Sequence, residues 1–134
     1  MGKKTIGDRN RTKGHNGERL YAKIFNEILG FKYCVTSRYG SRIHDDAGID
    51  LINLPFNVQI KTGKQRGMNP SQVLSYMKGR IKELFPKSAP EQEMASIVIH
   101  RKDVGQGRKR NAQDDLVFMS FEDFTKFLNK IEWD

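Results

Sequence analysis

The stretch GIDLINLPFNVQIKTG, Gly48 to Gly63, decides the fold that we predict for this chain. It reads as two short apolar strands joined by a Pro-Phe pair, which is the pattern of a β-hairpin. Counting outward from a two-residue turn places Asp50 opposite Lys61, so Asp50, Gln59 and Lys61 share one face of the sheet. Pro-Phe is a poor two-residue turn, and other registers therefore stay open. The stretch predicts a strand pair with polar side chains gathered on one face.

Length and composition indicate one globular domain that spans residues 1–134. The chain has 134 residues, of which 37% are hydrophobic and 30% are charged. No apolar run approaches the ~20 residues that a membrane-spanning helix needs. Cys34 is the only cysteine, which excludes an internal disulfide and a cysteine-based zinc site. We expect an intracellular, cytoplasmic protein.

The order of the predicted elements gives an α/β fold. We read residues 1–16 as a mobile basic arm and expect a helix from Gly17, where Leu20, Ile24 and Ile28 recur every four residues. Further on, the pattern predicts strands near 32–37, 50–54, 57–62, 94–100 and 116–120, and helices over 70–85 and 121–131, with a loop over 38–48. Helix, three strands, helix, two strands and helix make a mixed central sheet flanked by helices.

Glu18 lies on the apolar side of the first predicted helix, together with Tyr21, Ala22 and Phe25. A carboxylate there is costly unless it is paired or binds a metal. By itself, Glu18 is read more simply as an exposed acid at a helix start, and Lys61 as an ordinary lysine at a strand end. Taken together with Asp50 and Gln59, they suit metal-assisted hydrolysis of a phosphodiester bond, because Mg²⁺ prefers oxygen ligands.

These residues carry a resemblance to a known family. GIDLI…VQIKTG, with NGERLYAKIFNEILGF upstream, resembles the PD-(D/E)XK nuclease superfamily, and within it the archaeal-type Holliday-junction resolvases and their phage relatives. The glycine–glutamate signature falls at Gly17-Glu18, and the acid-x-lysine pair at residues 59–61. The resemblance covers roughly residues 14–85 by motif, and the remainder by element order alone. It implies a restriction-endonuclease-like αβββαβ core.

The resemblance also implies a catalytic site. Its metal ligands would be Glu18, Asp50, Gln59 and the backbone carbonyl of Ile60, with Mg²⁺ as the ion and Mn²⁺ as a substitute. Lys61 would orient the attacking water or stabilise developing charge. The family's loop serine, which would touch the scissile phosphate, corresponds to Ser37 or Ser41. One departure is clear: the family usually has Glu or Asp where this chain has Gln59, and a neutral amide is a weaker ligand.

The charge balance predicts a nucleic-acid partner. Lys and Arg total 24 against 16 Asp and Glu, a formal net charge of +8. Such a balance is typical of proteins that bind polyanions. Phosphate contacts position a duplex without reading its sequence, so we expect branched four-way DNA, and a homodimer that makes two cuts. The DNA-binding candidates are Lys13, Arg19, Arg38, Arg42, Lys64, Arg66, Arg108, Lys109 and Arg110.

Two alternatives to a junction resolvase remain. One is another nuclease of the same superfamily, either a restriction-like enzyme or an end-processing exonuclease. Gln72 and Tyr76, four residues apart on one helix, resemble an element of its exonuclease branch, although many helices contain such a pair by chance. The other is a catalytically inactive DNA-binding module with the same fold. His15, His44 and His100 have no metal-ligand spacing, and we expect them on the surface or in loops.

Overall fold

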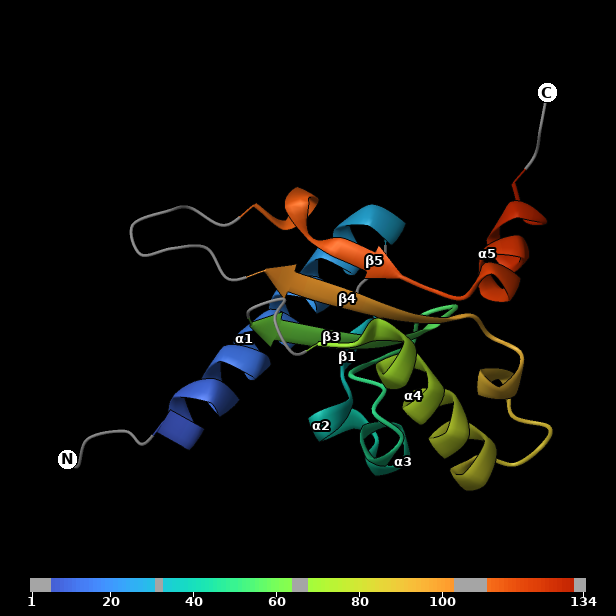
Figure 1. The fold of residues 1–134 in the computed structure, drawn as a ribbon, viewed down its shortest axis with the longest axis horizontal. Coiled ribbons are helices and arrows are strands. Elements are labelled where there is room, and N and C mark those ends of the chain that lie inside the picture. The colour runs from blue at the N-terminus through green and yellow to red at the C-terminus, as the bar shows by residue number, and fades with distance from the viewer. Residues whose placement is uncertain (1–5, 31–32, 64–67, 103–110, 132–134) are drawn as a thin grey trace.

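The structure is a computed structural model that describes residues 6–30, 33–63, 68–102 and 111–131. Helices and strands are interspersed along the chain, and two short 3-10 helices precede β4 and β5 (Figure 1). The elements are α1 (Ile6–Leu29), β1 (Val35–Thr36), α2 (Ser37–Gly40), α3 (Arg42–Asp46), β2 (Leu51–Ile52), β3 (Asn57–Gly63), α4 (Pro70–Leu84), η1 (Pro90–Gln92), β4 (Ser96–Lys102), η2 (Ala112–Asp114), β5 (Leu116–Phe118) and α5 (Phe121–Leu128).

A mixed three-stranded sheet in the order β3-β4-β5 forms the centre of the fold. β3 runs parallel to β4, with Asn57 beside Ser96, and β5 runs antiparallel to β4. Parallel neighbours need a long crossover, and α4 supplies it between β3 and β4. β1 and β2 form a separate antiparallel pair. The predicted α/β class with a mixed sheet is confirmed.

Helices cover both faces of this sheet (Figure 1). α1 packs Tyr21 and Ala22 on the face that carries Val58 and Ile60. α4 packs on the opposite face, where Met77 and Ile81 join Ala47, Ile49 and Val98 in a second apolar cluster.

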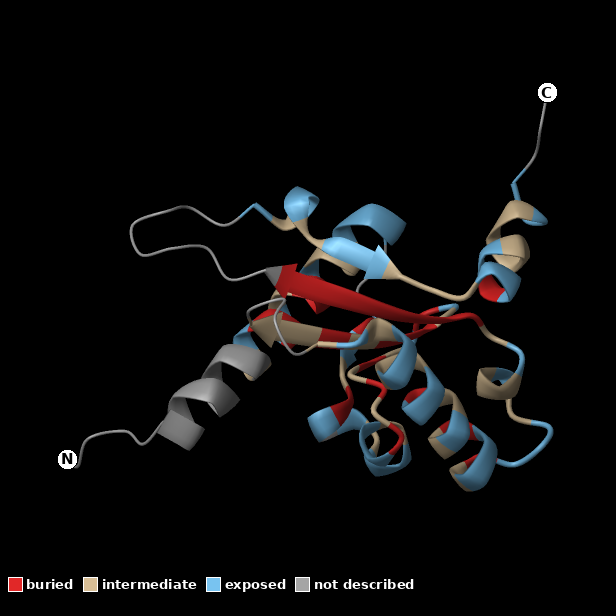
Figure 2. Cartoon of the chain, in the orientation of Figure 1, coloured by how far each residue is buried: buried red, intermediate tan, exposed pale blue. Residues whose placement is uncertain are grey.

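β4 is the central strand, and it is buried from Ser96 to Arg101 (Figure 2). Its apolar run does not alternate with polar residues because both faces of the strand are covered. Ile97 and Ile99 belong to the α1 cluster and Val98 to the α4 cluster. This explains why the sequence predicted β4 well.

The predicted hairpin with Asp50 opposite Lys61 is wrong. β2 pairs with β1, and its neighbour Asp50 donates its backbone N–H to the carbonyl of Val58 at 2.8 Å. Four residues, 53–56, bend between the strands in place of a two-residue turn. Asn53 adopts a positive φ of 68° there, and Pro55 has no N–H to contribute to a ladder.

Two other boundaries also differ from the prediction. α1 begins at Ile6, so a mobile arm through residue 16 is wrong for residues 6–16, whereas residues 1–5 lie outside the described chain. The predicted loop over 38–48 contains the short helices α2 and α3. The first half of α1 is polar, contains several glycines and asparagines and has little apolar periodicity. The sequence pattern therefore did not indicate a helix there.

Cys34 and His100 are both buried. Burial raises the pKa of the Cys34 thiol to about 11. The surface position predicted for His100 is wrong. This histidine is 2% exposed within β4, and its Nε2 lies 3.2 Å from the carbonyl oxygen of Gly63.

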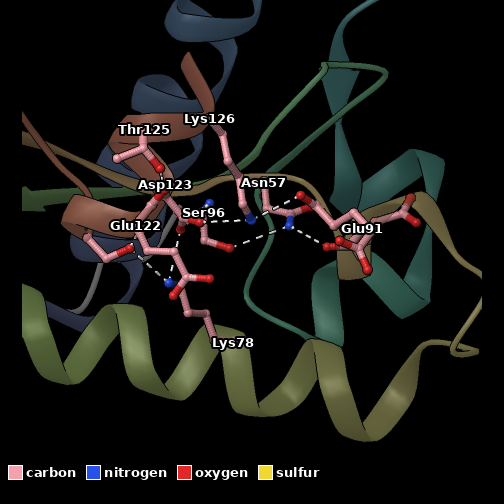
Figure 3. Close-up of polar contacts among 10 residues, drawn as sticks. Asn57, Lys78, Glu91, Ser96, Glu122, Asp123, Thr125 and Lys126 are labelled. Atoms are coloured by element: carbon pink, nitrogen blue, oxygen red, sulfur yellow. Dashed lines mark hydrogen bonds and ion pairs between the residues drawn. The ribbon is translucent and has the colours of Figure 1, made fainter. Parts of the chain in front are cut away.

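α5 is tied to the sheet by a buried acid, Asp123 (Figure 3). One carboxylate oxygen accepts the backbone N–H of Ser96 at 3.0 Å and pairs with Lys78 Nζ at 3.0 Å. The other oxygen pairs with Lys126 at 3.1 Å. Ser120 caps α5 by accepting the N–H of Asp123 at 3.1 Å. None of the helices among the described residues is long and apolar enough to cross a membrane.

Candidate active site

Asp50 lies at the edge of β3 that does not pair with β4. Its carboxylate Oδ2 accepts the backbone N–H of Ile60 at 2.7 Å, and its own N–H donates to Val58. The Asp50 carbonyl accepts the N–H of Ser37, the first residue of α2, at 2.9 Å. Three backbone-mediated hydrogen bonds therefore fix this acid against β3 and α2.

Glu18 and Arg38 form a two-pronged ion pair. Glu18 is 4% exposed, and its two oxygens accept from Arg38 Nε at 2.9 Å and from Nη2 at 3.1 Å. Because α1 begins at Ile6, Glu18 lies in the middle of the helix, so the dipole at a helix start does not account for it. The buried acid predicted from the apolar stripe is present, and an arginine neutralises it.

Electrostatics connect Asp50 with Glu18. Burial and the nearby Glu18 charge raise the pKa of Asp50 to about 7, and the Ile60 N–H, Lys61 and Arg38 oppose this rise. The hydrogen bond and charge of Glu18 raise the pKa of Arg38 above its usual value, outweighing partial burial. Two acids and two cations thus form one interacting group between the middle of α1 and the edge of β3.

Gln59 lies on a different side of β3 from Glu18. Gln59 and Lys61 alternate with the residues that face α1, and they stand beside Val98 and His100, so they occupy the face that α4 covers. The Gln59 side chain packs against Gly48, whose φ of +82° favours glycine. Its Oε1 is buried and makes no hydrogen bond within the described chain. Asp50, at the strand edge, interacts electrostatically with Glu18 on one side of β3 and with Lys61 on the other.

The two candidate serines have different surroundings. Ser37 is fully buried next to Arg38, and its Oγ has no hydrogen-bond partner among the described residues. Ser41 caps α3, and its Oγ lies 2.6 Å from Nδ1 of His44, whose Nε2 lies 3.1 Å from Glu91 Oε1. Ser37 therefore adjoins Asp50 and Arg38, whereas Ser41 already has a structural role.

The predicted DNA-binding residues are described only in part. Arg19 is exposed on α1, Arg38 pairs with Glu18, and Arg42 is 94% exposed with a long 3.8 Å contact to Asp46. Lys13 belongs to α1, but its side chain is outside the description. Lys64, Arg66, Arg108, Lys109 and Arg110 lie outside the described residues.

The sequence did not predict the close approach of α1 to the sheet at Gly17. Gly17 lets α1 approach the sheet closely, since a Cβ there would collide with the Arg101 guanidinium and lie 3.0 Å from Thr62 Oγ1. Arg101 is a buried cation of β4 next to the Glu18 turn. A glycine inside a helix costs about 1 kcal/mol relative to alanine, and this cost was the available signal.

Comparisons with protein-family models, curated proteins and solved structures found no match.

The donor set decides whether a metal ion fits. The described residues contain no group of three or more His, Cys, Asp or Glu side chains that could hold one. Mg²⁺ needs less, because it commonly binds one or two carboxylates and keeps several waters. Glu18 and Asp50 supply two acids, and the charge of Glu18 helps to raise the pKa of Asp50. Gln59, on the other side of β3 from Glu18, supplies a buried amide oxygen that has no hydrogen-bond partner among the described residues. The chemistry of these donors fits Mg²⁺ or Mn²⁺.

Proposed function

We propose that this chain is a divalent-metal-dependent, structure-specific DNA endonuclease that resolves four-way Holliday junctions. The observation that carries the proposal is the placement of two acids: buried Glu18 pairs with Arg38 at 2.9 Å, and Asp50 is bonded to the Ile60 N–H at the edge of β3. The Glu18 charge adds to burial in raising the pKa of Asp50, and Lys61 and Arg38 oppose this rise. Two coupled acids next to two cations suit a site that holds a cation and a phosphate.

The element order supports a restriction-endonuclease-like αβββαβ core. α1 precedes three strands, α4 links β3 to β4, and both faces of the sheet are covered. The short β2 and its pairing with β1 depart from the expected hairpin. In this proposal the Asp50 side chain, bonded to the Ile60 N–H, takes the position at the β3 edge that a longer β2 would occupy.

Each residue has a proposed role in hydrolysis. Asp50 and Glu18 would hold the metal ion, together with the Ile60 carbonyl. Gln59 lies on the other side of β3 from Glu18, so its amide oxygen would serve the same ion only across the strand edge at Asp50. The bound ion would activate a water and neutralise charge on the phosphate. Lys61 would stabilise the negative charge that develops on the phosphate, and Ser37 would donate to a phosphate oxygen. Ser41 is a weaker candidate because its hydroxyl already contacts His44.

Charge supports DNA as the partner. A net charge of +8 with exposed Arg19 and Arg42 favours a polyanion, and contacts to phosphates recognise shape in place of base sequence. A homodimer would provide the two sites that symmetric cleavage of a junction needs.

The inactive DNA-binding module is the second candidate. Two observations favour it: the neutral Gln59 replaces the acid of the resembling family, and Arg38 already neutralises Glu18. A restriction-like or end-processing nuclease remains the alternative among enzymes. Gln72 and Tyr76, whose spacing suggested an exonuclease, are exposed on α4, the helix that covers the face opposite to α1.

Cleavage of a synthetic junction tests the function. A labelled four-way junction and a linear duplex of the same arms are incubated with the protein and either Mg²⁺ or EDTA. We expect paired symmetric nicks in the junction with Mg²⁺ alone. Asp50→Asn should abolish the nicks and retain binding, while the exposed control Asp114→Asn should cut like the wild type. Binding without cutting would favour the inactive module, and cuts in the linear duplex would favour another nuclease.

A further inference from the structure

We infer that Arg38 is an internal cation that competes with the divalent metal ion for Glu18, so that metal binding requires the guanidinium to leave. This inference rests on the proposed metal site and adds to it a device that controls its occupancy.

The geometry of the pair is the first step. Both Glu18 oxygens accept hydrogen bonds from the Arg38 guanidinium, at 2.9 and 3.1 Å. Bidentate, charge-assisted pairs of this kind are among the stronger polar contacts in proteins. A metal ion bound between Glu18 and Asp50 would lie beside a guanidinium of the same sign, and the two cations would repel one another. Glu18 can therefore serve one of them well, but not both.

The unequal exposure of the partners shows which one can move. The Glu18 side chain is 5% exposed and belongs to the long helix α1, whereas that of Arg38 is 36% exposed on the four-residue helix α2. When the pair breaks, the arginine can extend into solvent and the carboxylate stays in place. The released guanidinium is then available for a phosphate, which it recognises in the same forked geometry.

Asp50 provides the fixed second half of the metal site. Its Oδ2 is held by the Ile60 N–H, and its other oxygen makes no hydrogen bond within the described chain. Its backbone is tied through Ser37 to the same short helix that carries Arg38. When the Glu18–Arg38 pair breaks, Glu18 becomes available to the metal ion, and Asp50 keeps its position against β3.

Binding of Mn²⁺ to the protein alone tests the inference without DNA or activity. Free Mn²⁺ is measured by electron paramagnetic resonance during titration of wild type, Arg38→Gln and Lys23→Gln at pH 8. Lys23 is exposed on α1, so its substitution removes one positive charge without touching the pair. We expect Arg38→Gln to bind Mn²⁺ roughly tenfold more tightly than wild type, because its strong competitor is gone. Lys23→Gln should change the affinity by less than about twofold.

The possible outcomes separate this inference from the function. If the wild type binds Mn²⁺ and Arg38→Gln binds it with the same or a lower affinity, competition by Arg38 is contradicted, while the proposed metal site stands. Absence of Mn²⁺ binding in every variant would overturn both. Arg38→Gln leaves buried Glu18 unpaired, so its fold is checked by circular dichroism. If Arg38→Gln is unfolded, Arg38→Lys is titrated in its place. We expect it to bind Mn²⁺ more tightly than wild type, by less than about tenfold, and an unchanged affinity would contradict the competition.

Discussion

The carboxyl group of Asp50 is held at the edge of β3, where burial and the Glu18 charge raise its pKa to about 7. An aspartate in an unfolded chain titrates near 3.9. The folded state therefore binds this proton more tightly than the unfolded state. The resulting contribution to stability is fully present below about pH 4 and is lost as the pH rises through about 7.

Asp50→Asn should therefore stabilise the metal-free protein at high pH. The amide oxygen can still accept the Ile60 N–H, but the variant carries no charge that must be buried. In EDTA at pH 8 we expect the free energy of unfolding to increase by about 1–3 kcal/mol, after allowance for partial contact with solvent. At pH 4.5 the increase should be much smaller. Urea unfolding at both values measures it, with Asp114→Asn as the control. A loss of stability at pH 8 would mean that the charged carboxylate is favourable.

At the scale of elements, Asp123 joins α5 to α4 and β4. Burial alone would raise its pKa, but the Ser96 N–H, Lys78 and Lys126 outweigh this effect and lower it. A lowered folded pKa makes a contribution to stability that is present above the unfolded value near 3.9. It disappears as the pH falls through the folded value.

Asp123→Asn should destabilise the fold at pH 7 by about 2–4 kcal/mol, since the substitution leaves two lysines without their buried partner. Urea unfolding at pH 7 and at pH 3 measures the change. The difference from wild type should shrink at pH 3, because there the unfolded aspartate, with a pKa near 3.9, binds a proton that the folded carboxylate with its lowered pKa resists. Glu122→Gln, an exposed neighbour in the first turn of α5, should change stability by less than about 1 kcal/mol. Equal effects of both substitutions would contradict the anchoring role of Asp123.

The elements with local signals were predicted, and those set by distant contacts were not. Pro70 begins α4, and Ser120 caps α5, as such residues do at helix starts. Apolar periodicity likewise identified Glu18 as an inward acid. Its partner Arg38 lies 20 residues further along the chain, and no local pattern joins the two.

The strand pairing shows the same limit. A count across a two-residue turn assumed a ladder between neighbouring strands. Instead, a left-handed Asn53 and the four-residue bend moved Asp50 beside Val58 and Ile60. Alternation in β3 placed Gln59 and Lys61 on one face, and Val58 and Ile60 do occupy the other, but it could not tell which helix would cover each face.

For the whole molecule, the charge of +8 predicts strongly salt-dependent binding to DNA. Each phosphate that the protein neutralises releases counterions, so the logarithm of the affinity falls linearly with the logarithm of salt concentration, with a slope of about −0.9 per contact. About six contacts would lower the affinity roughly a thousandfold between 50 and 200 mM salt. Fluorescence anisotropy of a labelled four-way junction in EDTA measures this slope.

The same titration separates phosphate contacts from recognition of junction shape. Salt should weaken binding to the junction and to a linear duplex in parallel, because phosphate contacts are common to both, so the ratio of the two affinities should stay nearly constant. Arg42→Gln removes an almost fully exposed cation and should reduce the slope by about one if Arg42 contacts a phosphate. Affinity that is independent of salt would show that the net charge does not drive binding, and the proposal of a DNA partner would then lose its electrostatic support.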